Sequence, residues 1–210
     1  MEQQIQSAAQ TPTTGGESVQ KLDRMPGYPY SFNEYFRRFL WRFVQATLFR
    51  WSPPRAFRWR KMLLRLFGGK LVGKVLIRAS TDITHPWLLE MDDWSVLADG
   101  VTVYNLGMVR IGCHTTISQN TYLCAGTHDY TRNDLPLQRP PITIGNGVWV
   151  AAGAFIGPGV TIGDNSVIGA CAVVVKDVPE GVVAAGNPAR VIKPRQMRPY
   201  ENADGPREPA

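Results

Sequence analysis

The sequence predicts a mainly β protein, in which a coil of short parallel strands follows a pair of basic amphipathic helices. Two periodicities support this fold class. Branched aliphatic residues recur every six positions after about residue 71, whereas apolar residues recur at steps of three and four between residues 31 and 67. The 210 residues, 44% of them hydrophobic, are enough for one compact domain with appendages and too few for a multidomain machine.

The two ends of the chain have the composition of flexible segments. Residues 1–27 are rich in Gln, Ser, Thr, Ala and Gly and show no apolar period, and residues 194–210 are similar. Segments of this composition cannot bury enough apolar surface to fold. We therefore expect a disordered arm over 1–27 and a flexible tail over 194–210.

Residues 28–70 form a basic and aromatic segment in which we expect both helices. The first begins at Ser31, a suitable N-cap, and ends at the proline pair after Trp51. The second runs from about Pro54 to Phe67 and ends at two glycines. The apolar residues with helical spacing in the first helix are Phe32, Tyr35, Phe36, Phe39, Leu40, Phe43, Val44 and Leu48.

The net charge of +6 is divided unevenly along the chain. Residues 31–80 contain twelve of the 23 Lys and Arg and a single acid, Glu34, so this window has a charge of +11 and the remainder is mildly acidic. A basic segment can bind nucleic acid. These cations, however, alternate with Phe, Trp and Leu at helical spacing. That pattern favours a helix pair that packs on the β domain or lies on an anionic membrane surface.

The six-residue repeat extends over residues 71–193. From Ile144 the chain reads IGNGVW, VAAGAF, IGPGVT, IGDNSV and IGACAV, each with a branched aliphatic first and a small or β-branched residue fifth. Similar hexads occur upstream, with a two-residue slip. A period of six fits neither a helix nor a simple strand, but it suits a coil with three flat faces. Three hexads, or about 18 residues, then complete a turn, which places Ile144 over Ile162 and Val150 over Ile168.

These hexads resemble those of the hexapeptide-repeat acyltransferases. The segments NTYLCAGTHDY and PITIGNGVWVAAGAFIGPGVTIG are similar to the sugar O-acetyltransferase branch of that family. The stretch ITHPWLLEMDDWSVLADGVTVYNLGMVRIG, with the preceding LLRLFGGK, resembles most closely the colanic acid biosynthesis acetyltransferases of exopolysaccharide gene clusters. The resemblance implies a left-handed parallel β-helix, a homotrimer, and acetyl-CoA as co-substrate without a metal.

The resemblance also implies a catalytic residue. His128 ends the LCAGTH hexad, where the coil gives way to an irregular excursion over residues 129–141, and it matches the family's catalytic histidine. Transfer of an acetyl group from a thioester to a hydroxyl needs a base for the hydroxyl proton, and imidazole suits neutral pH. Asp129 and Asp134, in or beside the excursion, are candidates to orient the ring.

Two further residues match the acceptor site of the family. Asn120, eight residues before His128, corresponds to an asparagine that hydrogen-bonds the acceptor sugar. The alternative is an asparagine that is tolerated at a turn. Trp149 corresponds to a tryptophan near the acceptor pocket; the alternative is packing between coils or subunits.

Four residues match positions that meet coenzyme A in the family. Ala152 corresponds to the position whose main-chain N–H faces the thioester. Lys176, and Arg190 and Lys193 in the segment GNPARVIK, correspond to contacts with the phosphates and adenine. Val175 stands where the family often has Thr, which removes a hydroxyl contact. For Arg190 and Lys193, an ordinary solvated charge pair is the alternative.

Other chemistries stay open at this point. A metal enzyme of the same fold needs three histidines that meet at a subunit interface. His114 and His128, however, are 14 residues apart, off the stacking period, and His85 precedes a proline far upstream. A Cys124–His128 pair would form a covalent acyl-enzyme, although direct transfer needs no nucleophile. Outside enzymes, the alternative is a β-helix that only serves as a scaffold at a membrane.

Together these features predict an acetyl-CoA-dependent O-acetyltransferase for a sugar or lipid-linked saccharide of an exopolysaccharide. A small soluble acceptor, a free sugar or a drug, is the alternative. The spacing of Cys113, Cys124 and Cys171 builds no disulfide framework or zinc clip. The sequence shows no secretory signal and no run of about 20 apolar residues. We expect a cytoplasmic enzyme without a nucleic-acid partner, with peripheral contact to the inner face of an anionic membrane as a further option.

Overall fold

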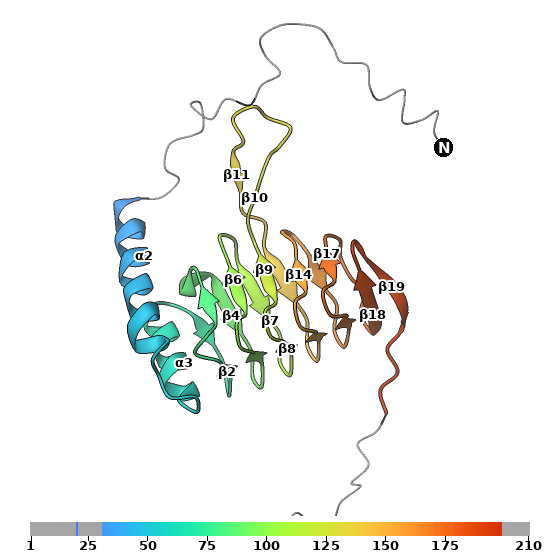
Figure 1. The fold of residues 1–210 in the computed structure, drawn as a ribbon, viewed down its shortest axis with the longest axis horizontal. Coiled ribbons are helices and arrows are strands. Elements are labelled where there is room, and N and C mark those ends of the chain that lie inside the picture. The colour runs from blue at the N-terminus through green and yellow to red at the C-terminus, as the bar shows by residue number, and fades with distance from the viewer. Residues whose placement is uncertain (1–19, 21–30, 199–210) are drawn as a thin grey trace, which may run out of the picture. The chain divides into compact units, whose positions relative to one another are not determined.

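The computed structural model describes residue 20 and residues 31–198. Apart from residue 20, the predicted arm lies outside the described residues, as does the predicted tail from residue 199 onward. The described chain divides into two units. One is the excursion His128–Gln138, and the other consists of Ser31–Thr127 together with residues 139–198. The larger unit is a parallel β-helix with two helices at its N-terminal end (Figure 1).

Both predicted helices are present. Helix α2 (Phe32–Val44) begins at Ser31, whose hydroxyl accepts a hydrogen bond from a main-chain amide of the first turn at 3.3 Å. It continues as a π-helical turn, η3 (Gln45–Phe49), so the hydrogen-bond pattern of the predicted helix changes near its end. Helix α3 (Phe57–Leu66) follows the proline pair and ends before Gly68, whose φ of +92° suits glycine.

Three parallel sheets form the flat faces of the β-helix, which confirms the predicted coil. The first sheet contains β1 (Lys70–Leu71), β4 (Leu89–Met91), β7 (Val109–Ile111), β12 (Ile142–Ile144) and β15 (Thr161–Ile162). The second contains β2 (Leu76–Ile77), β5 (Val96–Leu97), β8 (Thr116–Ile117), β13 (Trp149–Val150), β16 (Val167–Ile168), β18 (Val182–Gly186) and β19 (Ala189–Pro194). The third contains β3 (Asp82–Ile83), β6 (Thr102–Tyr104), β9 (Tyr122–Cys124), β14 (Phe155–Ile156) and β17 (Val173–Val174).

The stacking predicted for the C-terminal coils is confirmed. Ile144 lies opposite Ile162, and Val150 lies opposite Ile168. All four side chains are buried. The aliphatic at the first position of each hexad therefore forms the continuous apolar column inside the coil.

The N-terminal coils are two residues longer than the 18-residue turn, in agreement with the two-residue slip between the upstream hexads. Leu71 lies opposite Met91 and Leu97 opposite Ile117, so one turn takes 20 residues there. In the first coil, the corner between the third and first sheets contains a short 3-10 turn, η4 (Pro86–Leu88). The strands on either side of this longer corner keep their pairing in register, as Asp82 lies opposite Thr102 and Leu89 opposite Val109.

His85 and Asn105 occupy equivalent places at this corner in successive coils. The His85 amide donates to Asn105 Oδ1 at 2.8 Å, and Asn105 Nδ2 donates to the His85 carbonyl at 2.6 Å. Both residues are buried. In the next coil the chain passes Ala125, whose carbonyl accepts from the Gly107 amide at 2.7 Å, and then enters the excursion. The excursion thus interrupts the β-helix at the corner that is already irregular in the preceding coils.

Hydrogen bonds between coils run in both directions along the β-helix: the Leu76 amide donates to the Ser95 carbonyl of the next coil at 2.9 Å, and the Trp94 amide donates back to the Lys74 carbonyl at 2.7 Å. The first coil has no coil before it to bond the main-chain groups on its outer side. Helix side chains donate to two of these carbonyls. Trp41, buried on α2, donates from Nε1 to the Ile83 carbonyl at 2.6 Å. The helices thus close the open edge of the β-helix.

Arg60 on α3 caps the same edge with a fully buried guanidinium. Its Nε donates to the Ile77 carbonyl at 2.5 Å, and its terminal nitrogens donate to Ser52 Oγ, the Pro53 carbonyl and the Pro54 carbonyl at 2.7, 2.9 and 2.8 Å. Burial lowers the pKa of this guanidinium, while the four acceptors favour its charged form. One side chain therefore connects α3, the proline loop and the first coil.

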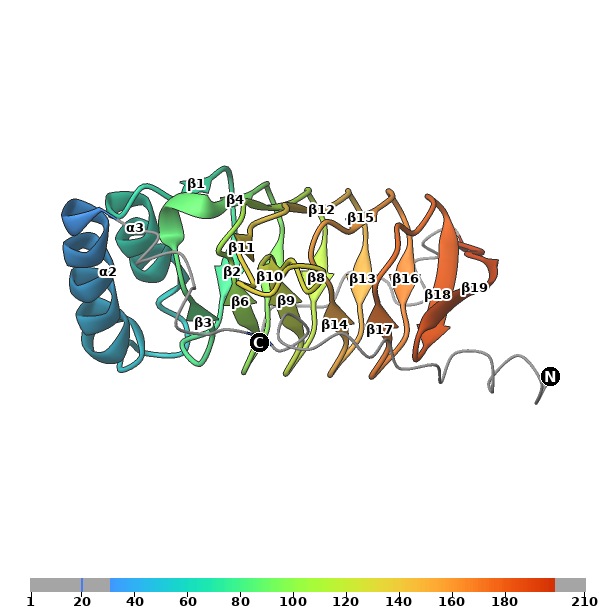
Figure 2. The same cartoon turned by 90° about the horizontal axis from the view of Figure 1, so that it is seen from above.

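At the other end, β18 pairs in parallel with β16 and forms an antiparallel hairpin with β19 (Figure 2). Arg195, just beyond the hairpin, donates from Nη1 to the carbonyls of Gly147 and Asn165 at 2.8 and 3.0 Å. The chain thus keeps its contact with the coils as far as the second residue of the predicted tail. Among the described residues, neither helix combines the length and the hydropathy of a membrane span.

Replacing Arg60 should destabilise the fold, because Arg60→Leu leaves the buried Ile77 carbonyl and the part-buried carbonyls of Pro53 and Pro54 without their donor. We expect a loss on the order of 3 kcal/mol in the free energy of unfolding, and a smaller loss for Arg60→Lys, which keeps the charge but not the fork of donors. Urea denaturation followed by tryptophan fluorescence measures both. Arg58→Leu, an exposed arginine of the same helix, is the control and should change stability by less than about 0.5 kcal/mol. Equal effects at positions 58 and 60 would contradict the capping role.

Candidate active site

The excursion is a small hairpin with its own hydrogen bonds. Strands β10 (Thr127–His128) and β11 (Leu137–Gln138) form a two-stranded sheet. The Asp129 amide donates to the Pro136 carbonyl at 3.0 Å, and the Leu135 amide donates to the Arg132 carbonyl at 3.2 Å. These bonds hold the turn that faces the histidine at the end of β10.

The ring of His128 is oriented by the main chain of this hairpin. Its Nδ1 lies 2.6 Å from the Leu135 carbonyl oxygen. A carbonyl only accepts, so Nδ1 carries the proton and the neutral ring presents the lone pair of Nε2. Leu135 has a φ of +41°, a conformation that costs energy for a leucine. The residue with this unusual backbone conformation is thus the one whose carbonyl contacts the His128 ring.

The two carboxylates named as candidates for this role have other partners in the hairpin. Asp129 accepts hydrogen bonds from the Thr131 amide and hydroxyl at 3.0 and 2.6 Å. Asp134 accepts two from the Arg132 guanidinium, at 2.9 and 2.6 Å. These bonds, from the Thr131 hydroxyl and from Arg132 respectively, lower the pKa of each carboxyl, so both are ionised at neutral pH. Both candidates make local contacts, and a role for either in orienting His128 stays a prediction.

In the larger unit, Asn120 and Ala152 lie at the same corner of the β-helix, in successive coils. Asn120 has a φ of +56° at the corner between the second and third sheets, and its exposed side chain covers Gly100 of the preceding coil. A Cβ on Gly100 would lie 2.2 Å from Asn120 Oδ1. In the following coil, the Gly153 amide donates to the Gln119 carbonyl at 2.9 Å, which places Ala152 at the same corner.

Trp149 belongs to the same surface. It lies on β13, opposite Thr116 of β8, with half of its side chain exposed. Its Nε1 donates to Ser118 Oγ at 3.0 Å, two residues before Asn120. The structure thus groups Asn120, Trp149 and Ala152 on neighbouring coils. Ser118 was not predicted, because a serine in a hexad carries no signal for the indole that it fixes.

The predicted coenzyme A residues lie toward the C-terminal end. Lys176 follows β17 and is exposed, as is Val175 beside it. Arg190 and Lys193 lie on β19, opposite Ala185 and Val183, and both are exposed. Their side chains are accessible to an anionic ligand, and their roles stay predictions.

The residues on which a covalent or metal-dependent mechanism would depend lie in surroundings that do not favour either chemistry. Burial raises the pKa of the Cys124 thiol, whose Sγ donates to the Gly126 carbonyl at 3.4 Å, so the nucleophilic thiolate is disfavoured. Burial lowers the pKa of His85 to about 4, and the ring stays neutral in its contact with Asn105. Within residues 31–198 no group of three His, Cys, Asp or Glu could hold a metal ion.

Comparison with known proteins defines the class to which this fold and site belong. Residues 141–176 match the family model of the bacterial transferase hexapeptide with six repeats. The Escherichia coli K12 protein named "Putative colanic acid biosynthesis acetyltransferase WcaF" is 49% identical over 156 residues, which cover 74% of this chain and 86% of that protein. The chain belongs to the hexapeptide-repeat acetyltransferases, and it is an acyltransferase.

Solved structures agree with this assignment. A maltose O-acetyltransferase from Clostridium difficile 630 superposes with a TM-score of 0.73 at 26% identity, over 87% of this chain and 100% of that one. The hexapeptide-repeat acetyltransferase VCA0836 from Vibrio cholerae O1 biovar eltor, in complex with acetyl coenzyme A, also has a TM-score of 0.73, at 25% identity over 84% and 96%. The predicted left-handed β-helix with an N-terminal helix pair is confirmed.

Because the thiol is held in its protonated form, Cys124→Ala should keep at least half of the wild-type acetyl transfer rate. A covalent acyl-enzyme on Cys124 would instead require a loss of several orders of magnitude. Steady-state rates measure this. Mass spectrometry after brief iodoacetamide treatment gives a second check, since the exposed Cys171 should be modified well before Cys124.

Proposed function

We propose that this protein transfers the acetyl group of acetyl-CoA to a hydroxyl of a sugar, on an exopolysaccharide or its lipid-linked precursor. The observation that carries the proposal is the state of His128. Its Nδ1–H is bound to a main-chain carbonyl, and Nε2 is left with its lone pair on an exposed ring. The names of the relatives and the acetyl-CoA bound to the Vibrio protein support the two substrates.

In the proposed reaction, His128 Nε2 removes the proton of the acceptor hydroxyl while the hydroxyl oxygen attacks the carbonyl carbon of the thioester. The tetrahedral oxyanion needs an N–H donor, a role that we assign to the main chain of Ala152. The C–S bond then breaks, and the leaving thiolate of coenzyme A takes the proton from the imidazolium. His128 returns to its neutral form, and the acetyl group remains on the sugar oxygen.

The other predicted residues position the two substrates. Asn120 would hydrogen-bond the acceptor sugar, and the exposed face of Trp149 would pack on its ring. Lys176, Arg190 and Lys193 would contact the phosphates of coenzyme A, as cations on accessible surface can. For the orientation of His128, the structure favours the Leu135 carbonyl over the nearby carboxylates, because it contacts the ring directly.

We propose that the working enzyme is a homotrimer, as the resemblance to the family implies. On the outer side of the third sheet, the rings of Tyr122 and Phe155 stack at 5.8 Å, with Tyr104 6.3 Å from Tyr122. This partly exposed aromatic row suits contact with another copy. All three cysteines are free, which fits the reducing cytoplasm that we propose as the location.

We also propose peripheral contact with an anionic membrane. On α2, Phe32, Phe36, Phe39 and Phe43 share one face at helical spacing, and each is more than half exposed. Arginines flank this aromatic face within a segment of net charge +11. Aromatic and basic residues together are typical of helices that lie in a membrane interface.

The general base is tested with His128→Asn, which removes the ring without changing the fold of the coils. The rate of acetyl transfer from acetyl-CoA to candidate sugars should fall by roughly 10² or more. His114→Asn is the matched control, because His114 is an exposed histidine at a corner with a φ of +54° that asparagine tolerates. A rate for His128→Asn within about threefold of wild type would reject the proposed mechanism.

If the Leu135 carbonyl orients the ring, Asp129→Asn and Asp134→Asn should each lower the rate by less than about tenfold. A carboxylate that orients a catalytic histidine is worth far more, up to roughly 10⁴ in the serine proteases. The pH dependence of kcat/KM is the second readout, since loss of a carboxylate that acts on the catalytic base would also change the pH profile. A loss of about 10³ in the acetyl transfer rate of either variant would instead indicate that this carboxylate orients His128.

A further inference from the structure

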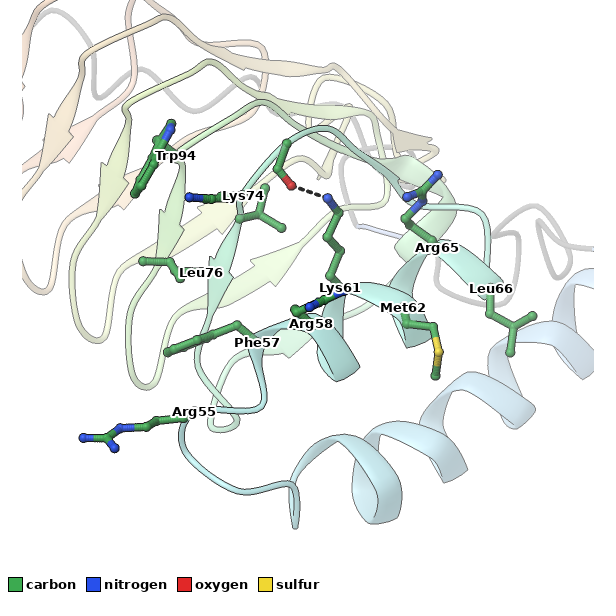
Figure 3. A pocket seen from close by; sticks show the side chains of 12 residues that line it. Arg55, Phe57, Arg58, Lys61, Met62, Arg65, Leu66, Lys74, Leu76 and Trp94 are labelled. Carbon is green, nitrogen blue, oxygen red and sulfur yellow. Dashed lines mark hydrogen bonds between the residues drawn. The ribbon is translucent and has the colours of Figure 1, made fainter.

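A cavity of about 950 Å³ lies between α3 and the first coils, away from every residue assigned to acetyl transfer. Five of its lining residues are cationic (Figure 3). Four of them, Arg55, Arg58, Lys61 and Arg65, lie on α3 or just before it, and Lys74 comes from the coil opposite. No lining residue is acidic.

The described chain provides these cations with no ion-pair partner, although the Asp93 carboxylate lies nearby and accepts a hydrogen bond from the Lys74 main-chain amide. Within residues 31–198, none of the five forms an ion pair with a carboxylate, whereas Lys70 and Arg78 of the same segment both do. Lys61 donates from Nζ to the Gly73 carbonyl. Like charges that share one cavity raise the energy of the folded protein, and a bound anion would relieve that repulsion.

The remaining wall of the cavity is apolar and open to solvent. Phe57, Met62 and Leu66 extend from α3, and Leu66 is 76% exposed. Trp94, 47% exposed on the coil side, lies with its ring 4.6 Å from Lys74 Nζ. Figure 3 shows Trp94 and Lys74 side by side across the cavity from α3. Each side of the cavity thus combines cations with apolar surface.

We propose that this cavity binds the phosphate group of a lipid in an anionic membrane, with the cations on the phosphate oxygens and the apolar wall on the acyl part. A free phosphate would use the cations but not the exposed Leu66, Met62 and Trp94. The volume falls in the range of pockets that bury small ligands. The inference rests on the peripheral membrane contact proposed above and does not depend on the acetyl transfer reaction.

The test measures binding of the full chain to phosphatidylcholine vesicles with and without phosphatidylglycerol. Wild-type protein should bind the vesicles that contain phosphatidylglycerol. Arg58→Gln/Arg65→Gln should weaken that binding by about tenfold or more, since each basic residue near an anionic surface contributes substantially. Leu66→Gln, at an exposed position, should also weaken it.

Arg50→Gln/Lys70→Gln is the matched control, because it removes the same charge from the same segment outside this cavity. It should stay within about threefold of wild type. Equal losses in the two double variants would overturn the cavity site while leaving peripheral contact in place. If the wild-type protein does not bind the vesicles, both the cavity site and the peripheral membrane contact are rejected. Release of the protein from the vesicles by glycerol 3-phosphate would overturn the proposal that the ligand is a lipid, and would indicate a site for a free phosphate. The rate of acetyl transfer, measured without vesicles, separates all these outcomes from the proposed reaction.

Discussion

In-register stacking of one coil on the next is the constraint on which the rest of this structure depends. A strand of two or three residues makes too few hydrogen bonds to be stable by itself. Stacked in parallel, such strands align their inward side chains, so that Ile117, Val150 and Ile168 follow one another on the second sheet with no solvent exposure. Burial of each aliphatic side chain contributes about 1.5–3 kcal/mol. Stability therefore accumulates coil by coil, and the two ends need covers.

The helix pair is such a cover, and its composition reflects two demands. Toward the coils it presents Trp41 and Arg60, which donate hydrogen bonds to carbonyls of the first coil. Away from the coils it exposes Phe36, Phe39 and other aromatic residues among many cations. An ordinary capping element would have a polar outer face. The retained aromatic and basic surface is the physical basis for the proposed contact of this end of the molecule with a membrane.

Stacking also explains how residues far apart in the sequence come to lie at one corner. Corners repeat with the coils, so Asn120 and Ala152 share a corner although the excursion separates them along the chain. The corner that holds His85 and Asn105 in the first coils is where the excursion with His128 leaves the next. Insertions are tolerated there because the strands keep their register on either side. The fold thus supplies rigid positions for the proposed substrate contacts and a separate hairpin for the proposed base.

The sequence by itself determined the three-faced coil, the stacking of Ile144 on Ile162 and the helix pair, because a repeat of inward aliphatics every six residues is compatible with few other structures. It also singled out His128 through resemblance to a family. The two-residue slip between the upstream hexads marked the longer first coils, and only the tertiary structure placed the extra residues at the corner between the third and first sheets. It alone placed the Leu135 carbonyl on the His128 ring and drew Asp129 and Asp134 to neighbouring donors. Main-chain carbonyls are the same in every residue, so their role in a site appears only once the chain has folded around them.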